Sequence, residues 1–233
     1  MSDLDRYLDF AKAHQDMFIN PPGAIFTILL DPTQIQEAEE VMERKLLGYG
    51  ATPEQAHSWS RVGVAFQDQY SFLLRDAVRF PDGSLGTYIR FVNPDEDDAH
   101  GVIILPVYQG QVLLINHFRH ATRTWFLEAP RGFGDPGKTS EENAQRELAE
   151  EIEATVARLV ALGSTYPDAG ATAECNDLFF AELSAYGQAD QQEAIADLRL
   201  VPIDEFERLI RENVITDGYT LAAYARAKVW GLL

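Results

Sequence analysis

The stretch Gly132–Ala154, GFGDPGKTSEENAQRELAEEIEA, carries the most specific pattern in this chain. Within it, Glu147 precedes Glu150 by three positions and Glu151 by four, so a helix would gather the three carboxylates on one face. Carboxylates aimed at one point repel each other unless a cation lies between them, and hard divalent cations such as Mg²⁺ take oxygen ligands of this kind. The alternative is a solvated acidic helix face, which is the commoner fate of a Glu-rich helix.

Local signals predict where this helix begins. Residues 132–137 contain three glycines and an Asp-Pro pair, a composition typical of a turn-rich loop. Thr139 is followed three residues later by Glu142, the spacing of a capping box at a helix N-terminus. We therefore predict a loop that leads directly into a helix over about 141–152.

Composition restricts the class of protein. Acidic side chains outnumber basic ones 37 to 19, for a formal net charge of −18. Such a surface repels nucleic acid and anionic membranes, because affinity for nucleic acid comes mainly from Lys and Arg. Cys175 is the single cysteine, which suits a reducing cytosol. No apolar run approaches the roughly 20 residues of a membrane span, and the acidic start is unlike a signal peptide. We expect a soluble, cytoplasmic protein.

Residues 1–97 are predicted to form a helical region that ends in a β-hairpin. Pro81-Asp82-Gly83 is a turn signal between two β-prone runs. The acidic run Asn93–Asp98 follows and is the predicted boundary, which leaves 98–233 as a second domain. The predicted elements of the first region are helices over 3–17 and 32–47, a helix that opens at Thr52, and strands over 24–30, 72–80 and 84–92.

Strands and helices are mixed beyond the boundary. This order predicts an α/β fold in which helices pack on a mixed sheet. The predicted strands cover 101–108, 111–118, 125–129, 158–166, 177–183 and 198–201, and the predicted helices cover 141–152, 204–211 and 219–230.

The opening stretch resembles a Nudix box, G-x5-E-x7-R-E-U-x-E-E-x-G-U, in which U is an aliphatic residue. The positions that match are Gly132, Arg146, Glu147, Leu148, Glu150 and Glu151. Lys138 stands where the box has its first Glu, and Glu153 stands where it has its later Gly. A glycine at that point commonly takes a left-handed conformation, so we expect Glu153 to remove a flexible helix terminus.

The resemblance continues on both sides of the box. It is similar to the nucleoside-diphosphate-sugar branch of the Nudix superfamily, typified by ADP-ribose pyrophosphatases. The further matching segments are Leu114–Arg119 (LINHFR), Glu128–Gly132 (EAPRG), Tyr166–Gly170 (YPDAG) and Ile215–Ala223 (ITDGYTLAA). His117 replaces a Gln of that branch and Ala169 a Pro. The resemblance implies a Nudix α/β/α sandwich, a mixed sheet between helices, with the helical and β-hairpin region as an N-terminal extension.

The resemblance implies a metal site. Glu147, Glu150 and Glu151 would bind divalent cations, Mg²⁺ or alternatively Mn²⁺, with the backbone carbonyl of Arg131 as a further ligand. Arg146 would orient Glu147 and also reach Glu150 at i+4. Such cations neutralise pyrophosphate oxygens and lower the pKa of a bound water. Arg146, Glu147 and Glu151 are thereby predicted catalytic residues.

Other residues are assigned to the base and the substrate. Glu193, in a late loop over 187–195, is the predicted general base, and an exposed loop glutamate is its alternative reading. Arg119, Arg131 and Lys138 are the predicted substrate-binding residues, because arginine suits bidentate phosphate contacts. A surface ion pair is the alternative for each cation, and Lys138 could instead cap its loop. Glu128 could bind metal or bracket the site.

The implied function is metal-dependent hydrolysis of the diphosphate bond in an ADP-ribose-like or nucleotide-sugar substrate, with release of a nucleoside monophosphate. Lys138, Glu153 and Ala169 motivate an alternative: a catalytically weak or inactive nucleotide-binding sensor. A hydrolase of free nucleoside triphosphates is a third reading. The resemblance also implies a homodimer that pairs through its N-terminal strands, with no nucleic-acid or membrane partner.

Overall fold

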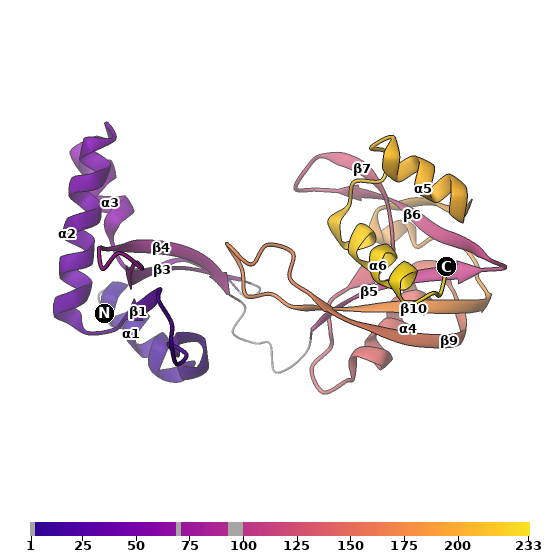
Figure 1. Cartoon of the computed structure of the whole chain (residues 1–233), viewed down its shortest axis with the longest axis horizontal. Coiled ribbons are helices and arrows are strands. Elements are labelled where there is room, and N and C mark those ends of the chain that lie inside the picture. Colours follow the sequence, from indigo (N-terminus) through magenta and orange to yellow (C-terminus); the bar gives the residue numbers. More distant parts are fainter. Residues whose placement is uncertain (1–2, 69–70, 93–99) are drawn as a thin grey trace. The chain divides into compact units, whose positions relative to one another are not determined.

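A computed structural model describes residues 3–68, 71–92 and 100–233 (Figure 1). The chain divides into two compact units. One comprises Met1–Asp95 and Asp168–Ala173, and the other comprises Glu96–Pro167 and Glu174–Leu233. The predicted boundary, Asn93–Asp98, lies entirely outside the described residues.

The first unit is a four-stranded antiparallel sheet packed against helices. Its elements are α1 (Asp3–Ala13), the 3-10 turn η1 (Gln15–Phe18), β1 (Thr27–Leu29), α2 (Pro32–Gly48), α3 (Pro53–Ser60), β2 (Gly63–Gln67), β3 (Phe72–Arg79) and β4 (Leu85–Val92). β3 pairs with β4 along one edge, and β1 and β2 share its other edge. Tyr7, Ile35 and Leu74 are fully buried between the sheet and the helices.

Most of the predicted elements of this unit are present. The hairpin of β3 and β4 is confirmed, and Thr52 caps α3 through a capping box. The helix predicted over 3–17 ends at Ala13, and η1 follows it. β2 was not predicted, because most of its side chains are exposed and show no alternation; its pairing with β3 defines it.

The second unit is built on a seven-stranded mixed sheet. Its strands are β5 (Gly101–Tyr108), β6 (Gln111–Arg119), β7 (Thr124–Glu128), β8 (Arg131–Gly132), β9 (Thr155–Thr165), β10 (Asn176–Ala185) and β11 (Ile195–Pro202). The main path runs β11-β6-β5-β10-β9, with β7 paired to β6 and β8 paired to β5. β5 and β10 are parallel and the other neighbours are antiparallel. β8 was not predicted, since two residues carry no periodic pattern.

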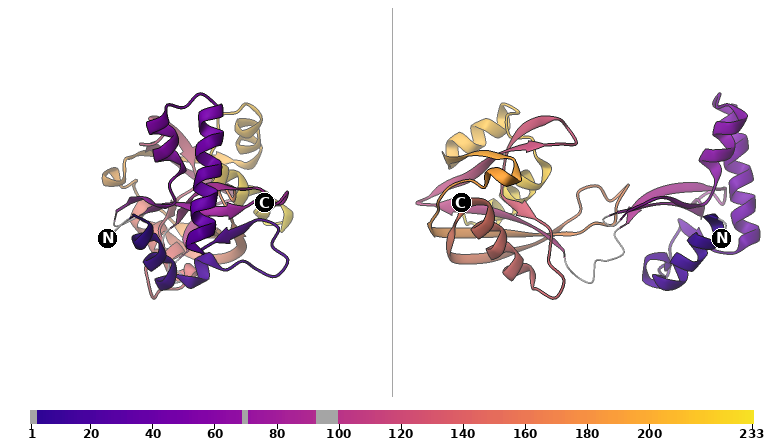
Figure 2. Two further views of the ribbon diagram at one scale, coloured as in Figure 1. Left: turned by 90° about the vertical axis from the view of Figure 1, so that its left-hand side faces the viewer. Right: turned by 180° about the vertical axis from the view of Figure 1, so that it is seen from behind.

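Helices cover both faces of this sheet, which confirms the α/β/α sandwich (Figures 1 and 2). They are α4 (Ser140–Ile152) on one face, and α5 (Ile203–Arg211) and α6 (Gly218–Val229) on the other. Side chains alternate between two cores: Leu113 faces α4, whereas the next residue, Leu114, faces α5 and α6. Among the described residues, no helix has the length and apolar content that a transmembrane span requires.

Candidate active site

Both ends of α4 have well-defined caps. Thr139 Oγ1 accepts a hydrogen bond from Glu142 N at 3.2 Å, and Glu142 Oε2 accepts one from Thr139 N at 2.8 Å, so the predicted capping box is confirmed. The helix ends at Glu153, whose φ of 50° and ψ of 38° are left-handed. Glu153 therefore retains the left-handed conformation that a glycine commonly takes at this point, so the expected loss of a glycine-type helix end does not extend to the backbone conformation.

Two of the three box carboxylates are buried together. Leu148 and Ile152 pack on the sheet, and Glu147 and Glu151 on the same side of α4 are 8% and 4% exposed. Glu150 is exposed, because it points away from that side. The structure thus gathers two carboxylates in the interior and leaves the third at the rim.

Glu151 is held against β8. Its Oε2 accepts a hydrogen bond from the backbone N of Arg131 at 3.2 Å. Burial and the negative charge of Glu147 raise the pKa of Glu151 to about 8, although the Arg131 hydrogen bond opposes this rise. The pair Glu147–Glu151 is therefore an electrostatically unfavourable one, unless a proton or a cation is shared between the two carboxylates.

Glycine is required beside this pair. A Cβ at Gly132 would overlap the carboxylate of Glu147. Gly132 is brought there by the pairing of β8 with Val102 of β5. The first glycine of the box therefore makes room for a buried carboxylate.

Arg146 joins the loop to the helix. Its guanidinium donates to Glu147 Oε1 at 2.7 Å and to Glu150 Oε2 at 2.6 Å, so the predicted i+4 contact is present. It also donates to the carbonyl of Phe133 at 2.9 Å and lies 3.2 Å from Asp135 Oδ2. One arginine thus fixes Glu147, Glu150 and the loop before α4.

A second charged cluster surrounds Glu128 at the end of β7. Glu128 is fully buried, and Arg119 donates to its Oε1. Arg131 Nη2 lies 3.6 Å from Oε2, and His117 Nδ1 lies 3.4 Å from Oε1. Burial raises the pKa of Glu128, and the two arginines oppose that rise. Arg119 is therefore engaged with a carboxylate of its own chain.

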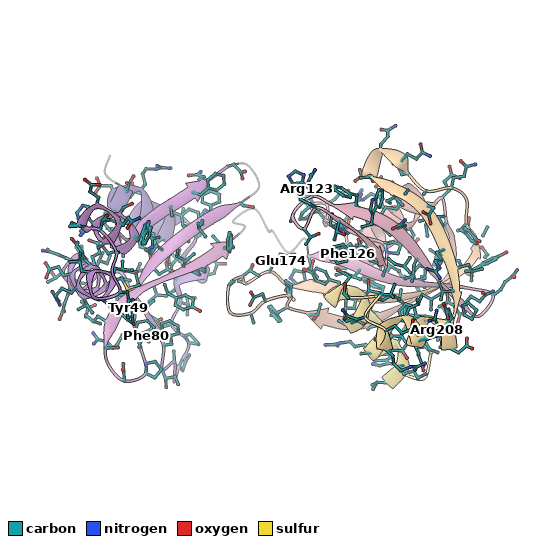
Figure 3. The ribbon with its side chains drawn as sticks, turned by 90° about the horizontal axis from the view of Figure 1, so that it is seen from above. Tyr49, Phe80, Arg123, Phe126, Glu174 and Arg208 are labelled. Carbon is teal, nitrogen blue, oxygen red and sulfur yellow. The ribbon has the colours of Figure 1, made fainter. Side chains whose placement is uncertain are left out.

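The N-terminus of α6 positions Arg131. Asp217 caps α6 by accepting from Thr220 N at 2.8 Å, and its Oδ1 lies 3.2 Å from Arg131 Nη1. The Arg131 guanidinium also lies over the Tyr219 ring, 4.7 Å from its centroid. Tyr219 is held in turn by Glu174, to whose Oε1 it donates at 3.3 Å; Glu174 is labelled in Figure 3. Burial raises the pKa of Tyr219 to about 12.

Three residues of this cluster had no role in the sequence reasoning: His117, Asp217 and Tyr219. Each lies in a segment that matches the family pattern. The sequence therefore pointed to these residues but did not show which side chains they contact. Burial and the charges of Arg119 and Arg131 lower the pKa of His117 to about 4, so its imidazole is neutral at neutral pH.

Lys138 and Glu193 lie at the edge of the site. Lys138 Nζ lies 2.7 Å from Asp135 Oδ2, and both side chains are 45% exposed. Glu193 ends the 3-10 turn η2 (Gln191–Glu193). Beside burial, the charges of Glu150 and Glu193 raise the pKa of Glu147, so Glu193 is within electrostatic range of the buried pair.

The residues present fit a divalent cation by their chemistry. In the part of the chain that the structure describes, no group of three or more His, Cys, Asp or Glu side chains is arranged to hold a metal ion. Glu147 and Glu151 nevertheless supply hard oxygen donors, and burial together with their mutual repulsion raises the pKa of Glu151. A hard cation would remove that repulsion.

An open pocket of ≈ 270 Å³ lies on the face of the sheet that carries α5 and α6. Its lining residues are Asn116, Trp125, Leu127, Asp197, Arg199 and Val214. Along β6 and β7, Asn116 and Leu127 alternate with His117 and Glu128, so the pocket and the charged clusters face opposite ways.

Comparison with known proteins identifies the class. The model of the NUDIX domain matches residues 98–224, more than half of the chain, so the chain belongs to the Nudix family of hydrolases. The fold is also similar to a crystal structure of an ADP compounds hydrolase, with a TM-score of 0.63 and 19% sequence identity. That match covers 73% of this chain and 91% of the other. No curated protein matches this sequence.

Proposed function

We propose that this protein hydrolyses the diphosphate bond of a nucleoside diphosphate linked to another moiety, such as ADP-ribose or a nucleotide sugar, with a divalent cation. The observation that carries the proposal is the buried pair Glu147–Glu151, whose repulsion a cation would relieve. The similar fold of an ADP compounds hydrolase supports the choice of substrate class.

Glu147, Glu151 and the carbonyl of Arg131 would hold the cation, Mg²⁺ or Mn²⁺, and Glu150 would join them from the rim of the site. When bound, it would neutralise phosphate oxygens and lower the pKa of a bound water. Arg146 keeps Glu147 and Glu150 in place through its two hydrogen bonds.

Glu193 would accept the proton of the attacking water. The water oxygen would bond to phosphorus, the phosphoanhydride P–O bond would break, and two phosphate monoesters would leave, one of them a nucleoside monophosphate. Arg119, Arg131 and Lys138 would contact the diphosphate. Because Arg119 and Arg131 already border Glu128, they are preorganised by that carboxylate.

A hydrolysis screen tests the proposal. ADP-ribose, NADH, nucleotide sugars and dinucleoside polyphosphates are incubated with Mg²⁺, and release of a nucleoside monophosphate is measured. We expect turnover of at least one substrate, abolished by EDTA and by Glu151→Gln, while Glu141→Gln on the exposed first turn of α4 retains it. Turnover that survives in Glu151→Gln would refute the mechanism. Metal-independent nucleotide binding without turnover would favour a sensor.

We further propose that the protein acts as a cytoplasmic homodimer joined through its N-terminal strands. β4 supports this, because it is an outer strand whose Tyr88 and Ile89 are 41% and 40% exposed, while its end at Phe91 is bridged to Thr172. Exposed apolar edge strands are templates for pairing with another chain.

A further inference from the structure

The end of α4 has a conformation that normally requires glycine. The backbone N–H groups of Glu153 and Ala154 both donate to Leu148 O, the latter at 3.0 Å, and Glu153 supplies the left-handed residue that commonly ends a helix. A side chain in this conformation costs free energy that glycine does not. Glu153 therefore carries a conformational penalty that a contact of its side chain can offset.

Gly187 supplies the place for that contact. A Cβ at Gly187 would overlap Oε2 of Glu153 and would lie 2.7 Å from its Cβ, an atom too close to the backbone to move away. The φ of Gly187 is not among the left-handed ones. At position 187, glycine is required because Glu153 leaves no room for a Cβ atom. At position 153, glycine would be preferred because the backbone is left-handed.

Three backbone amides fasten the start of the 187–195 loop to the end of α4. Gly187 N donates to Ile152 O at 3.0 Å, and Asp190 N donates to Glu151 O at 2.9 Å. Between them, Gln188 N donates to Oε2 of Glu153 at 3.2 Å. The only side-chain acceptor among these three bonds is Glu153.

The same loop carries Glu193. Asp190 accepts from Gln192 N at 2.8 Å and so caps the turn that ends at Glu193. We propose that Glu153 is a positioning residue, which fastens the loop through Gly187 and Gln188 and thereby fixes the position of Glu193. The placing of Glu193 as a base rests on the proposed function, whereas the fastening of the loop does not.

A stability cycle tests the contact without any activity measurement. Gly187→Ala should lower the melting temperature by about 5 °C, because the new methyl group meets Glu153. In a Glu153→Gly background the same change should cost less than about 1 °C, since the obstructing side chain is gone. Gly48→Ala, at a position with open space, should cost nothing in either background. Equal losses in both backgrounds would overturn the contact.

Hydrogen exchange tests the fastening. In Glu153→Gly, the amides of residues 188–193 should exchange at least about tenfold faster. Glu153→Gln should protect them as the native residue does, because its amide oxygen accepts the same bond. Unchanged exchange in Glu153→Gly would overturn the inference, whether or not the protein hydrolyses any substrate.

Kinetics then separate the two proposals. Glu153→Gly should lower kcat by about tenfold with little change in KM, whereas Glu153→Gln should have the native kcat. In a Glu193→Gln background, Glu153→Gly should cause no further loss of kcat. Full additivity of the two substitutions would show that Glu153 does not act through Glu193. Absence of turnover in the native protein would refute the proposed function and leave the stability and exchange results to decide the fastening.

Discussion

A fully buried carboxylate needs a charged partner, and Glu128 has Arg119. Arg119→Ala would remove the guanidinium that hydrogen-bonds this carboxylate and leave the longer contact to Arg131, so we expect the free energy of unfolding to fall by about 3 kcal/mol. Arg123→Ala is the matched control, because Arg123 lies in the exposed turn of the same hairpin (Figure 3). It should change stability by less than about 0.5 kcal/mol. Denaturant unfolding of both variants measures the difference; equal effects would contradict it.

Glu151 gives the stability of the metal-free protein a definite pH dependence. Its pKa is raised to about 8 from an ordinary 4.5, so the folded chain keeps a proton that the unfolded chain releases. The contribution of Glu151 to stability therefore falls as the pH rises from about 5 to about 8, by at most about 1.4 kcal/mol per pH unit. Thermal unfolding in EDTA should show the native protein losing stability relative to Glu151→Gln over this range. A constant difference would contradict the raised pKa.

At the scale of single residues, the sequence predicts which side chains are important more readily than it predicts their contacts. The i+4 spacing of Arg146 and Glu150 predicts their contact, because helix geometry is local. The partner of Arg119 is nine residues away, across the pairing of β6 with β7, and no local spacing specifies it. The left-handed conformation of Glu153 is likewise not predictable from local sequence, since the neighbouring Gly187 belongs to a distant loop.

Among the elements, α4 depends on its capping box. Thr139→Ala removes one acceptor for the first turn of α4, and we expect a loss of about 1 kcal/mol in stability together with reduced turnover. Thr52→Ala removes the equivalent cap of α3 in the other unit and should cost a similar amount with turnover unchanged. Denaturation and hydrolysis assays on both variants check this. A loss of turnover in Thr52→Ala alone would reverse the expectation.

Elements with a pattern of their own were predictable. α2, α3, α4 and the β3–β4 hairpin follow from apolar spacing, caps and turn residues, which act within a few positions. β2 and β8 exist because of their partners: β2 is mostly exposed, and β8 has two residues that pair with β5. Tertiary pairing, which a single strand's pattern does not encode, therefore limits prediction at this scale.

For the whole molecule, the proposed dimer has a direct test. Light scattering after size exclusion should give about twice the mass of one chain. Ile89→Lys on β4 should shift the protein toward monomer, because a charge on an edge strand opposes further pairing. Ile25→Lys, at a site 74% exposed and off that strand, should leave the dimer intact. A native monomer, or equal effects of the two lysines, would count against pairing through β4.

The segment Asp168–Ala173 belongs to the first compact unit, although it interrupts the sequence of the second. There, Phe91 N donates to Ala171 O at 2.8 Å, and Tyr88 donates to Gly170 O at 3.1 Å. Neither unit is therefore a continuous length of the gene. A fragment that ends near residue 97 would lack Asp168–Ala173, which belongs to the same compact unit. A single cut in the chain therefore releases neither unit whole.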